Sequence, residues 1–142
     1  PPTSEALAAM IQAPPAERSA YIKASVEVFR SFSGNSTLYD ESTQSEISAA
    51  SFDRCFYPQG FTRQMAAIVA YGNRQKALES LDIPTLVIHG DSDGIVPLEV
   101  SGRLTHAAVA GSELHVVVGG PHGITTSHAE EFNRVLLDFL AR

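Results

Sequence analysis

The first part of the chain carries hydrophobic residues at the spacing of amphipathic helices. Ile22, Val26 and Phe29 recur every three or four residues after Pro14-Pro15, and Ser33-Gly34 then supplies a stop signal. This pattern predicts a helix between the proline pair and the glycine. The same spacing and the intervening turn signals predict three further helices, at about residues 40–55, 61–71 and 73–80.

Beyond the fourth predicted helix the pattern changes, because short β-branched apolar runs now alternate with helical spacing. Residues 84–89 and 113–118 are such runs, each bounded by proline or glycine, and they predict strands buried on both faces. Helical spacing separates the two runs, at residues 99–110. We therefore expect an α/β fold, with a helical region at residues 1–80 and a βαβα region at residues 81–142.

The last predicted helix begins near residue 126 and has a clear amphipathic pattern. Ser127 and Glu130 have the spacing of a capping box, which satisfies backbone N–H groups at a helix start. The hydrophobic positions that follow fall on one face of the helix and predict a single inward side. They are Phe132, Val135, Leu136 and Phe139.

Two strands are too few for a stable parallel sheet. Parallel sheets bury both faces under helices, and sheets need more than two strands to cover their apolar faces. The helical half shows no alternating pattern that could supply another strand. We therefore expect the strand at residues 84–89 to pair with a strand outside residues 1–142, or to be covered by another chain.

Composition and charge exclude several classes of function. The 142 residues are 44% hydrophobic and 18% charged, so the chain can bury a sizeable core and is not expected to be disordered. The net charge of −6, without a basic cluster, excludes a nucleic-acid partner. The longest apolar run, residues 65–71, is far shorter than a membrane span. We expect a soluble, cytoplasmic protein without a membrane partner.

The single cysteine and the five histidines do not follow a metal-ligand pattern. Cys55 has no second cysteine to pair with, which excludes an internal disulfide and a cysteine-based zinc site, so we expect a small core residue. The histidines lack the spacing of a zinc site, and no metal is expected. His89, at a strand end, is interpreted as structural. Asp91 is interpreted as a turn residue whose carboxylate accepts backbone N–H groups.

The loops that follow the two predicted strands carry the residues suited to chemistry. In open α/β sheets, functional side chains gather at the carboxyl ends of strands. The loop after the first strand contains Asp91 and Asp93, and the loop after the second contains His122 between a proline and a glycine. A carboxylate facing an imidazole fixes the tautomer of the ring and stabilises its charged form during acid–base catalysis.

The motifs in these two loops resemble those of a known family. The segment His89-Gly-Asp-Ser-Asp-Gly-Ile-Val-Pro97, followed by Gly119-Gly-Pro-His-Gly123, is similar to the acid and histidine motifs of the α/β-hydrolase family. Within that family, the chain resembles the cofactor-free haloperoxidase and arylesterase branch. The resemblance runs from about residue 82 to residue 142, and the helical region more loosely resembles the lid of these enzymes.

This resemblance implies a role for four residues. It makes Asp93 the acid and His122 the base of a Ser-His-Asp triad, with Ile95 and Val96 lining the acyl pocket. It implies the last two parallel strands of the hydrolase core and a small-molecule ester as substrate. It implies no metal or organic cofactor.

The family pattern also requires a nucleophilic serine on a strand-to-helix elbow before the acid, and no such elbow precedes Asp93. Ser92 matches the letters G-x-S-x-G, but Ile-Val-Pro follows where the elbow must enter a helix. Ser92 also adjoins its own triad acid, so it cannot face His122. We expect an ester hydrolase that is inactive as this chain alone. Its serine would come from an amino-terminal half of the fold, as a separate segment or chain.

Three other functions stay open at this point. The haloperoxidase resemblance adds perhydrolysis, in which peroxide replaces water at the acyl-enzyme. The chain could instead be a non-catalytic interaction or lid module that retains the acid and histidine motifs. It could also be a complete small enzyme that uses Ser92 as its nucleophile.

Overall fold

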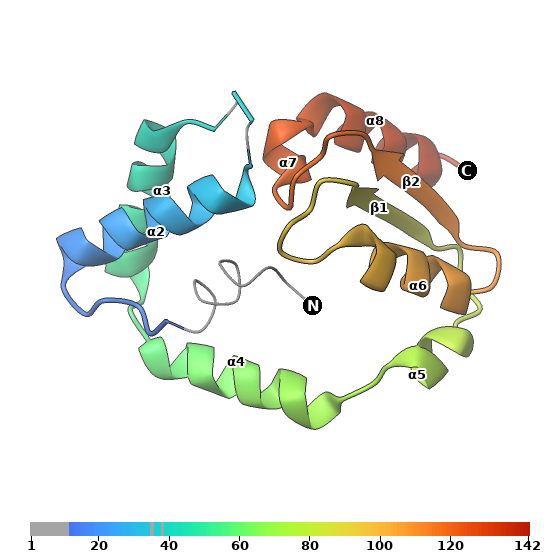
Figure 1. The fold of residues 1–142 in the computed structure, drawn as a ribbon, viewed down its shortest axis with the longest axis horizontal. Coiled ribbons are helices and arrows are strands. Elements are labelled where there is room, and N and C mark those ends of the chain that lie inside the picture. The colour runs from blue at the N-terminus through green and yellow to red at the C-terminus, as the bar shows by residue number, and fades with distance from the viewer. Residues whose placement is uncertain (1–11, 35, 38) are drawn as a thin grey trace.

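The computed structural model describes residues 12–34, 36–37 and 39–142, and it divides into a helical part and a part with strands (Figure 1). The predicted α/β class is confirmed. The predicted division into a helical region at residues 1–80 and a βαβα region at residues 81–142 stays a prediction. Within the helical region, residues 1–11, 35 and 38 lie outside the described residues. In chain order, the elements are α2 (Arg18–Phe32), α3 (Glu41–Arg54), α4 (Pro58–Tyr71), α5 (Gln75–Glu79), β1 (Leu86–Gly90), a 3-10 turn η1 (Leu98–Val100), α6 (Gly102–Ala108), β2 (Glu113–Val117), α7 (Ile124–Ser127) and α8 (Ala129–Leu140).

Helices α2 and α3 pack against each other, and both begin at a side-chain cap. The Glu17 carboxylate accepts the Ser19 and Ala20 N–H groups at the start of α2. At the start of α3, hydrogen bonds from the Thr43 hydroxyl and the Ser42 N–H lower the pKa of the Asp40 carboxyl. These caps satisfy N–H groups that have no partner within the helix, so they fix where each helix begins.

The contact between the two helices is aromatic on one side and ionic on the other. The Tyr21 ring lies 5.2 Å from Phe52 and 5.8 Å from Phe56, measured between ring centroids. Arg18 donates two hydrogen bonds of 2.7 Å to the Asp53 carboxylate. Cys55 follows directly as the C-cap of α3 and is exposed, so its prediction as a core residue was wrong. The last turn of α3 directs its aromatic neighbours inward and leaves the thiol outside.

The third helix begins three residues earlier than predicted. We expected a turn at Pro58-Gln59-Gly60, but these residues form the first turn of α4. Proline is tolerated there because the first N–H groups of a helix have no partner inside it. The next helix, α5, is shorter than its predicted range, and the Asn73 side chain accepts the Gln75 N–H at its start.

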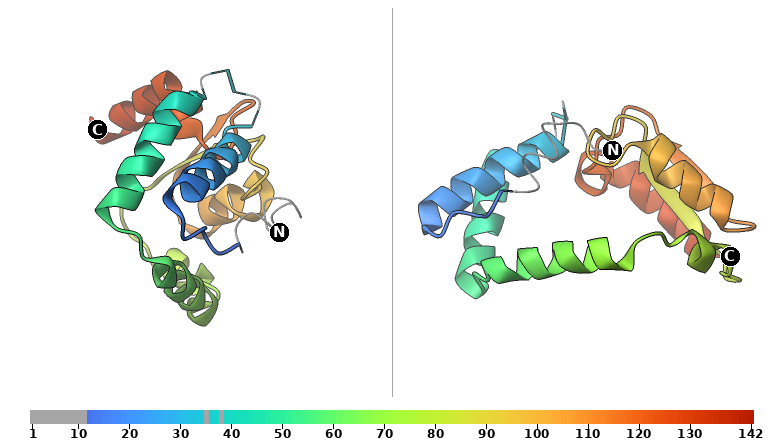
Figure 2. Two further views of the ribbon diagram at one scale, coloured as in Figure 1. Left: turned by 90° about the vertical axis from the view of Figure 1, so that its left-hand side faces the viewer. Right: turned by 60° about the horizontal axis from the view of Figure 1, so that its bottom comes forward.

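The two strands form a parallel pair that lies between α6 and α8 (Figures 1 and 2). Leu86 pairs with Glu113 and Gly90 with Val117, so the carboxyl ends of both strands reach the same edge of the sheet. The predicted helix at 99–110 is divided into η1 and α6 by Ser101, whose φ and ψ are −136° and −80°. This βαβ arrangement places the two following loops next to each other.

The predicted last helix is interrupted at His128, which separates α7 from α8. The capping box predicted for Ser127 and Glu130 was wrong, because the Ser127 hydroxyl donates to the Gly123 carbonyl inside α7. No side-chain cap bond is present at the start of α8. The predicted hydrophobic face of α8 is confirmed, since its four hydrophobic residues are half-buried while Leu137 and Leu140 are exposed.

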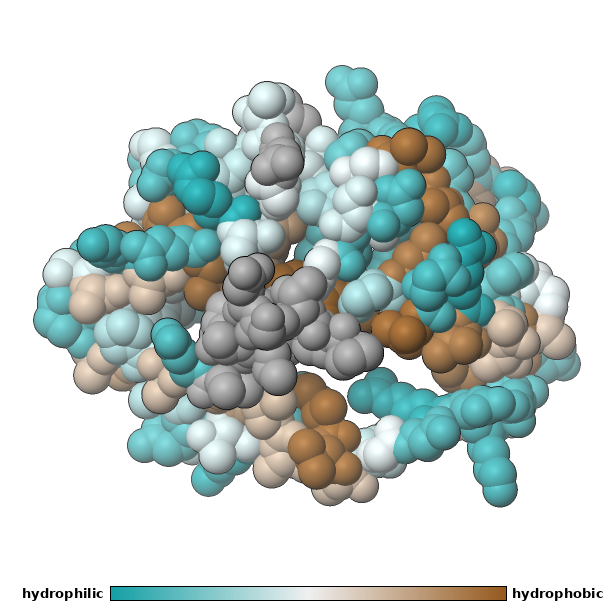
Figure 3. Space-filling model, viewed as in Figure 1, coloured by the Kyte–Doolittle hydropathy of each residue, from teal (hydrophilic) through white to brown (hydrophobic). Residues whose placement is uncertain are grey.

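The sheet has two strands within the described residues, and its first strand is incompletely covered. Four of the five β1 residues are half-buried, although parallel strands are ordinarily buried on both faces. Figure 3 shows hydrophobic residues at the surface over the part with strands. Leu104 of α6 and Val118, directly after β2, are 60% and 81% exposed. Pairing of β1 with a strand outside the chain stays a prediction. None of the described helices has the length and hydrophobicity needed to cross a membrane.

Candidate active site

The loops that follow β1 and β2 are joined by backbone and side-chain hydrogen bonds. The Ser92 N–H donates to the Gly120 carbonyl at 3.0 Å, and the Asp91 N–H donates to the Val117 carbonyl at 3.2 Å. The Asp91 carboxylate accepts the Gly119 N–H at 2.7 Å. Asp91 thus accepts a backbone N–H, as predicted, but from the neighbouring loop. These bonds fix the first loop relative to the second.

The loops approach each other so closely that only glycine fits at the end of β1. A Cβ built on Gly90 would lie 2.0 Å from the carbonyl oxygen of Gly120. That distance is far inside van der Waals contact, and the obstacle is backbone that cannot rotate away. Gly90 therefore sets how near the two loops can lie.

We expect Gly90→Ala to lower the free energy of unfolding by about 2–3 kcal/mol, because overpacking against fixed backbone forces the loops apart. The urea midpoint of the purified protein measures this change. Gly60→Ala is the matched control, since its Cβ would meet only the side chain of Tyr57, the N-cap residue of α4, at 3.1 Å. That control should keep or raise the midpoint. Equal midpoints for Gly90→Ala and the unmodified chain would contradict the close approach.

The structure brings Asp93 and His122 together, the contact expected from the two motifs. His122 Nδ1 lies 2.9 Å from Asp93 Oδ2, and the Asp93 side chain is only 5% exposed, whereas that of His122 is 38% exposed. The other carboxylate oxygen, Oδ1, accepts the N–H groups of Ile95 at 2.9 Å and Val96 at 2.8 Å. The carboxylate is therefore held from one side by backbone and from the other by the imidazole.

This arrangement assigns the tautomer of His122. An ionised carboxylate only accepts hydrogen bonds, so Nδ1 of the ring carries the proton that it shares with Asp93. The second ring nitrogen, Nε2, then has a lone pair and can accept a proton from a nucleophile. Because 38% of the His122 side chain is exposed, a reacting group can reach the ring. The pair can act as a general base with its orienting acid.

Ile95 and Val96 lie immediately after the acid. Ile95 is 6% exposed and Val96 is half-buried. Their observed contribution to the site is through backbone, because both donate to Asp93. That their side chains line an acyl pocket stays a prediction.

A residue missed by the sequence reasoning lies directly against the imidazole. The Phe32 ring, at the end of α2, is 5.3 Å from the His122 ring at an interplanar angle of 75°, an edge-to-face contact. The Phe32 carbonyl also accepts the Gly123 N–H at 3.0 Å. No sequence signal distinguishes Phe32 from the other aromatic residues of the helical part.

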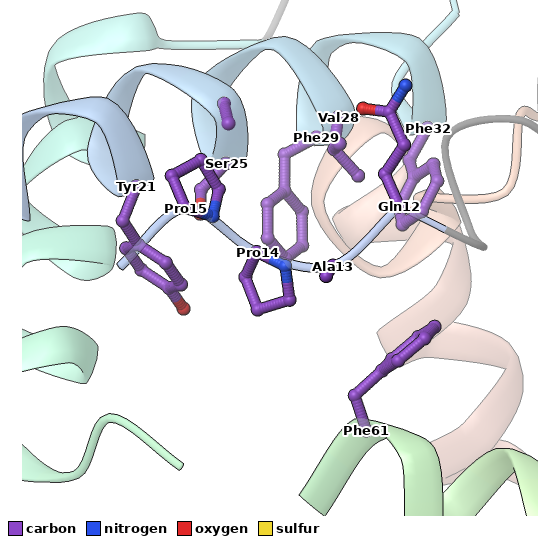
Figure 4. A pocket seen from close by; sticks show the side chains of 11 residues that line it. Gln12, Ala13, Pro14, Pro15, Tyr21, Ser25, Val28, Phe29, Phe32 and Phe61 are labelled. Atoms are coloured by element: carbon purple, nitrogen blue, oxygen red, sulfur yellow. The ribbon is translucent and has the colours of Figure 1, made fainter. Parts of the chain in front are cut away.

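An apolar pocket of about 390 Å³ opens beside this contact (Figure 4). It lies along α2, and Phe61 of α4 faces it from the opposite side. Phe32 belongs both to the pocket lining and to the contact with His122, so its ring lies between the pocket and the imidazole. Its aromatic lining consists of Tyr21, Phe29, Phe32 and Phe61.

The hydroxyl of Ser92 is used within its own turn. It is exposed, and its Oγ donates to Asp91 Oδ1 at 3.1 Å. Ser92 lies in a turn, where its N–H donates to the Gly120 carbonyl, and not at the start of a helix. This geometry disfavours Ser92 as a nucleophile. Among the residues that the structure describes, no group of three or more His, Cys, Asp or Glu side chains is placed to hold a metal ion.

No protein-family model matches the chain, but individual proteins do. A putative non-heme chloroperoxidase from Synechocystis is 44% identical over 63 residues, which are 44% of this chain and 23% of that protein. A bifunctional esterase/perhydrolase from Acinetobacter calcoaceticus is 37% identical over 75 residues, 51% of this chain and 27% of that protein. The chain thus spans about a quarter of the length of these relatives.

A solved structure extends the similarity to most of the chain. The bromoperoxidase from Bacillus anthracis is 38% identical with a TM-score of 0.69, over 89% of this chain and 45% of that one. The similarity therefore includes the helical part as well as the strands. The chain has the fold of the carboxyl-terminal part of the α/β-hydrolases, and it is similar to their non-heme haloperoxidase and esterase branch.

Proposed function

We propose that this chain supplies the acid, Asp93, and the base, His122, of a serine hydrolase that cleaves carboxylic esters. The observation that carries the proposal is the 2.9 Å contact between His122 Nδ1 and the buried Asp93 carboxylate. The esterase and haloperoxidase relatives support a hydrolytic reaction. A small-molecule ester is the proposed substrate, and the apolar pocket beside Phe32 would receive its hydrophobic group.

In the proposed mechanism, His122 Nε2 removes the proton of the serine hydroxyl as its oxygen attacks the ester carbonyl. The imidazolium then returns the proton to the leaving alcohol, and an acyl-enzyme remains. In the second half, His122 takes a proton from water as the water oxygen attacks the acyl group, and it returns that proton to the serine oxygen when the bond between serine and the acyl group breaks. Asp93 stays ionised throughout and stabilises the positive charge on the ring.

We further propose that the serine belongs to an amino-terminal half of the fold, on a separate segment or chain. The solved bromoperoxidase is about twice as long as the part this chain matches. The incompletely covered β1 supports the same proposal, because a neighbouring parallel strand would cover its open edge. The helical part would act as the lid, as its match to the same structure suggests.

Hydrolysis of 4-nitrophenyl acetate tests the proposal. We expect turnover by the complete hydrolase that contains this chain, and none by residues 1–142 alone. Ser92→Ala in the complete enzyme should leave the rate unchanged, because its hydroxyl serves the turn. Absence of turnover from both preparations would favour a non-catalytic module. Turnover by the isolated chain that disappears in Ser92→Ala would favour Ser92 as the nucleophile.

Perhydrolysis is a second candidate, favoured by the similarity to the bifunctional esterase/perhydrolase. Hydrogen peroxide would replace water in attacking the acyl-enzyme, with His122 removing its proton, and the products would be a peracid and the free serine. The same preparations, given acetate and hydrogen peroxide, would form peracetic acid. Ester hydrolysis without peracid formation would restrict the function to the esterase.

A further inference from the structure

The Asp93 carboxylate lies close to a second imidazole besides that of His122. His89, at the end of β1, has a side chain that is 12% exposed, and its Nε2 is 3.4 Å from Asp93 Oδ2. The same nitrogen is 2.8 Å from the carbonyl oxygen of Val96, at the far end of the loop. Two ring nitrogens, one from β1 and one from the loop after β2, thus approach one carboxylate oxygen.

The partner of His89 determines its protonation. A backbone carbonyl only accepts hydrogen bonds, so Nε2 carries a proton and donates it to Val96. The N–H of that residue in turn donates to Asp93 Oδ1 at 2.8 Å. The Val96 residue is therefore held on both sides, by His89 at its carbonyl and by Asp93 at its N–H. His89, Val96 and Asp93 thus contact one another in turn, across the loop that follows β1 and carries the acid, hereafter the acid loop.

Helix α6 packs against the His89 ring and restricts its position. A Cβ at Gly102, the first residue of α6, would lie 2.9 Å from His89 Nδ1. The ring therefore fills the space between the strand and the helix, and only glycine at this position of α6 permits it. The imidazole is fixed by this contact on one edge and by the Val96 carbonyl on the other.

We propose that His89 is a positioning residue, which holds the acid loop so that Asp93 Oδ2 reaches His122 Nδ1. The proposal rests on the proposed function for its kinetic consequence, although the geometric consequence can be measured in the isolated chain. A residue that only fills space would be replaceable by any side chain of similar volume. A residue that positions the acid loop by a hydrogen bond to the Val96 carbonyl requires an N–H group where His89 has Nε2.

Two substitutions separate these roles. His89→Leu keeps the volume but removes the donor, whereas His89→Gln places an amide N–H near the position of Nε2. His106→Leu is the matched control, because His106 is exposed on α6 and contacts Ser112 rather than the acid loop. Circular dichroism and the thermal midpoint establish that each variant folds.

The first measurement is the nitrogen NMR spectrum of the histidine rings in the isolated chain. In the unmodified protein we expect the proton on Nε2 of His89 and on Nδ1 of His122. His89→Leu should remove the fixed Nδ1–H tautomer of His122, while His89→Gln and His106→Leu should retain it. A proton found on Nδ1 alone of His89 would overturn the proposal, and so would an unchanged His122 signal in His89→Leu.

The second measurement is hydrolysis of 4-nitrophenyl acetate by the complete hydrolase. We expect His89→Leu to lower kcat roughly 10- to 100-fold with little change in KM, because a displacement of about 1 Å in a positioned group has effects of this size. His89→Gln should recover most of kcat. Equal losses in both variants would indicate a structural role and overturn the proposal. If the proton is found on Nε2 of His89 and on Nδ1 of His122 but the protein has no esterase activity, the proposed function is refuted and the positioning role of His89 is retained.

Discussion

Replacement of His122 by alanine is expected to lower kcat for ester hydrolysis by roughly 10⁴-fold or more, since the base of a triad acts as a unit with its nucleophile. The ring is the only part of His122 that contacts Asp93, and its Nε2 is the atom proposed to take the serine proton. Alanine removes both interactions. The residual rate would come from substrate binding and from whatever groups stabilise the oxyanion.

Burst kinetics with 4-nitrophenyl acetate in the complete hydrolase measure this effect, because acylation and deacylation both need the base. The exposed His106 provides the control, and His106→Ala should retain the rate of the unmodified enzyme. Because alanine also removes the hydrogen bond to the buried Asp93 carboxylate and the contact with Phe32, the thermal midpoint should fall, and circular dichroism establishes that the variant still folds. A rate for His122→Ala within tenfold of the unmodified enzyme would exclude His122 as the base.

Asp93→Asn is expected to lower kcat by about 10⁴-fold, through the tautomer of the neighbouring ring. Oδ1 of Asp93 accepts two backbone N–H groups, from Ile95 and Val96. In the asparagine variant only the amide oxygen can accept them, so the amide N–H₂ must point toward His122. Nδ1 would then accept a hydrogen bond, and the proton would move to Nε2. A ring protonated at Nε2 cannot remove the proton of serine.

The neighbouring carboxylate provides the control for this prediction. Asp91→Asn also exchanges a carboxylate for an amide, but Asp91 accepts the Gly119 N–H, which an amide oxygen can equally accept. Its rate should remain close to that of the unmodified enzyme. The nitrogen spectrum of the His122 ring should show the proton on Nε2 in Asp93→Asn and on Nδ1 in Asp91→Asn. Similar rates for the two variants would remove Asp93 from the mechanism.

Much of the local structure follows from the sequence because its causes are local. The spacing of Ile22, Val26 and Phe29 and the glycine after Ser33 correctly predicted α2, which ends at Phe32. Alternation of strands and helices predicted a parallel pair, and that pairing places Asp93 beside His122. The two motifs are distant in the chain, but strands of the same sheet bring their following loops together.

The errors arose where tertiary contacts decide the conformation. The division of the last helix at His128 is an exception, because it accompanies a local bond: the Ser127 hydroxyl donates to the Gly123 carbonyl instead of capping α8. The contact of Phe32 with His122 depends on how α2 approaches the second loop, which no local pattern specifies. The interpretation of His89 as structural, from its strand position, stays a prediction and is not one of these errors. The distance from His89 to Asp93 depends on the path of the loop between them.

The contact of Phe32 with the second loop has a consequence for inhibition. Its carbonyl holds Gly123 and its ring lies on His122, so the position of the imidazole depends on where α2 ends. Helix α2 packs chiefly on α3 rather than on the sheet. A small molecule that fills the pocket along α2 would press on the ring that contacts the base and would also occupy the proposed place of the ester's hydrophobic group. Such a compound would act as a competitive inhibitor.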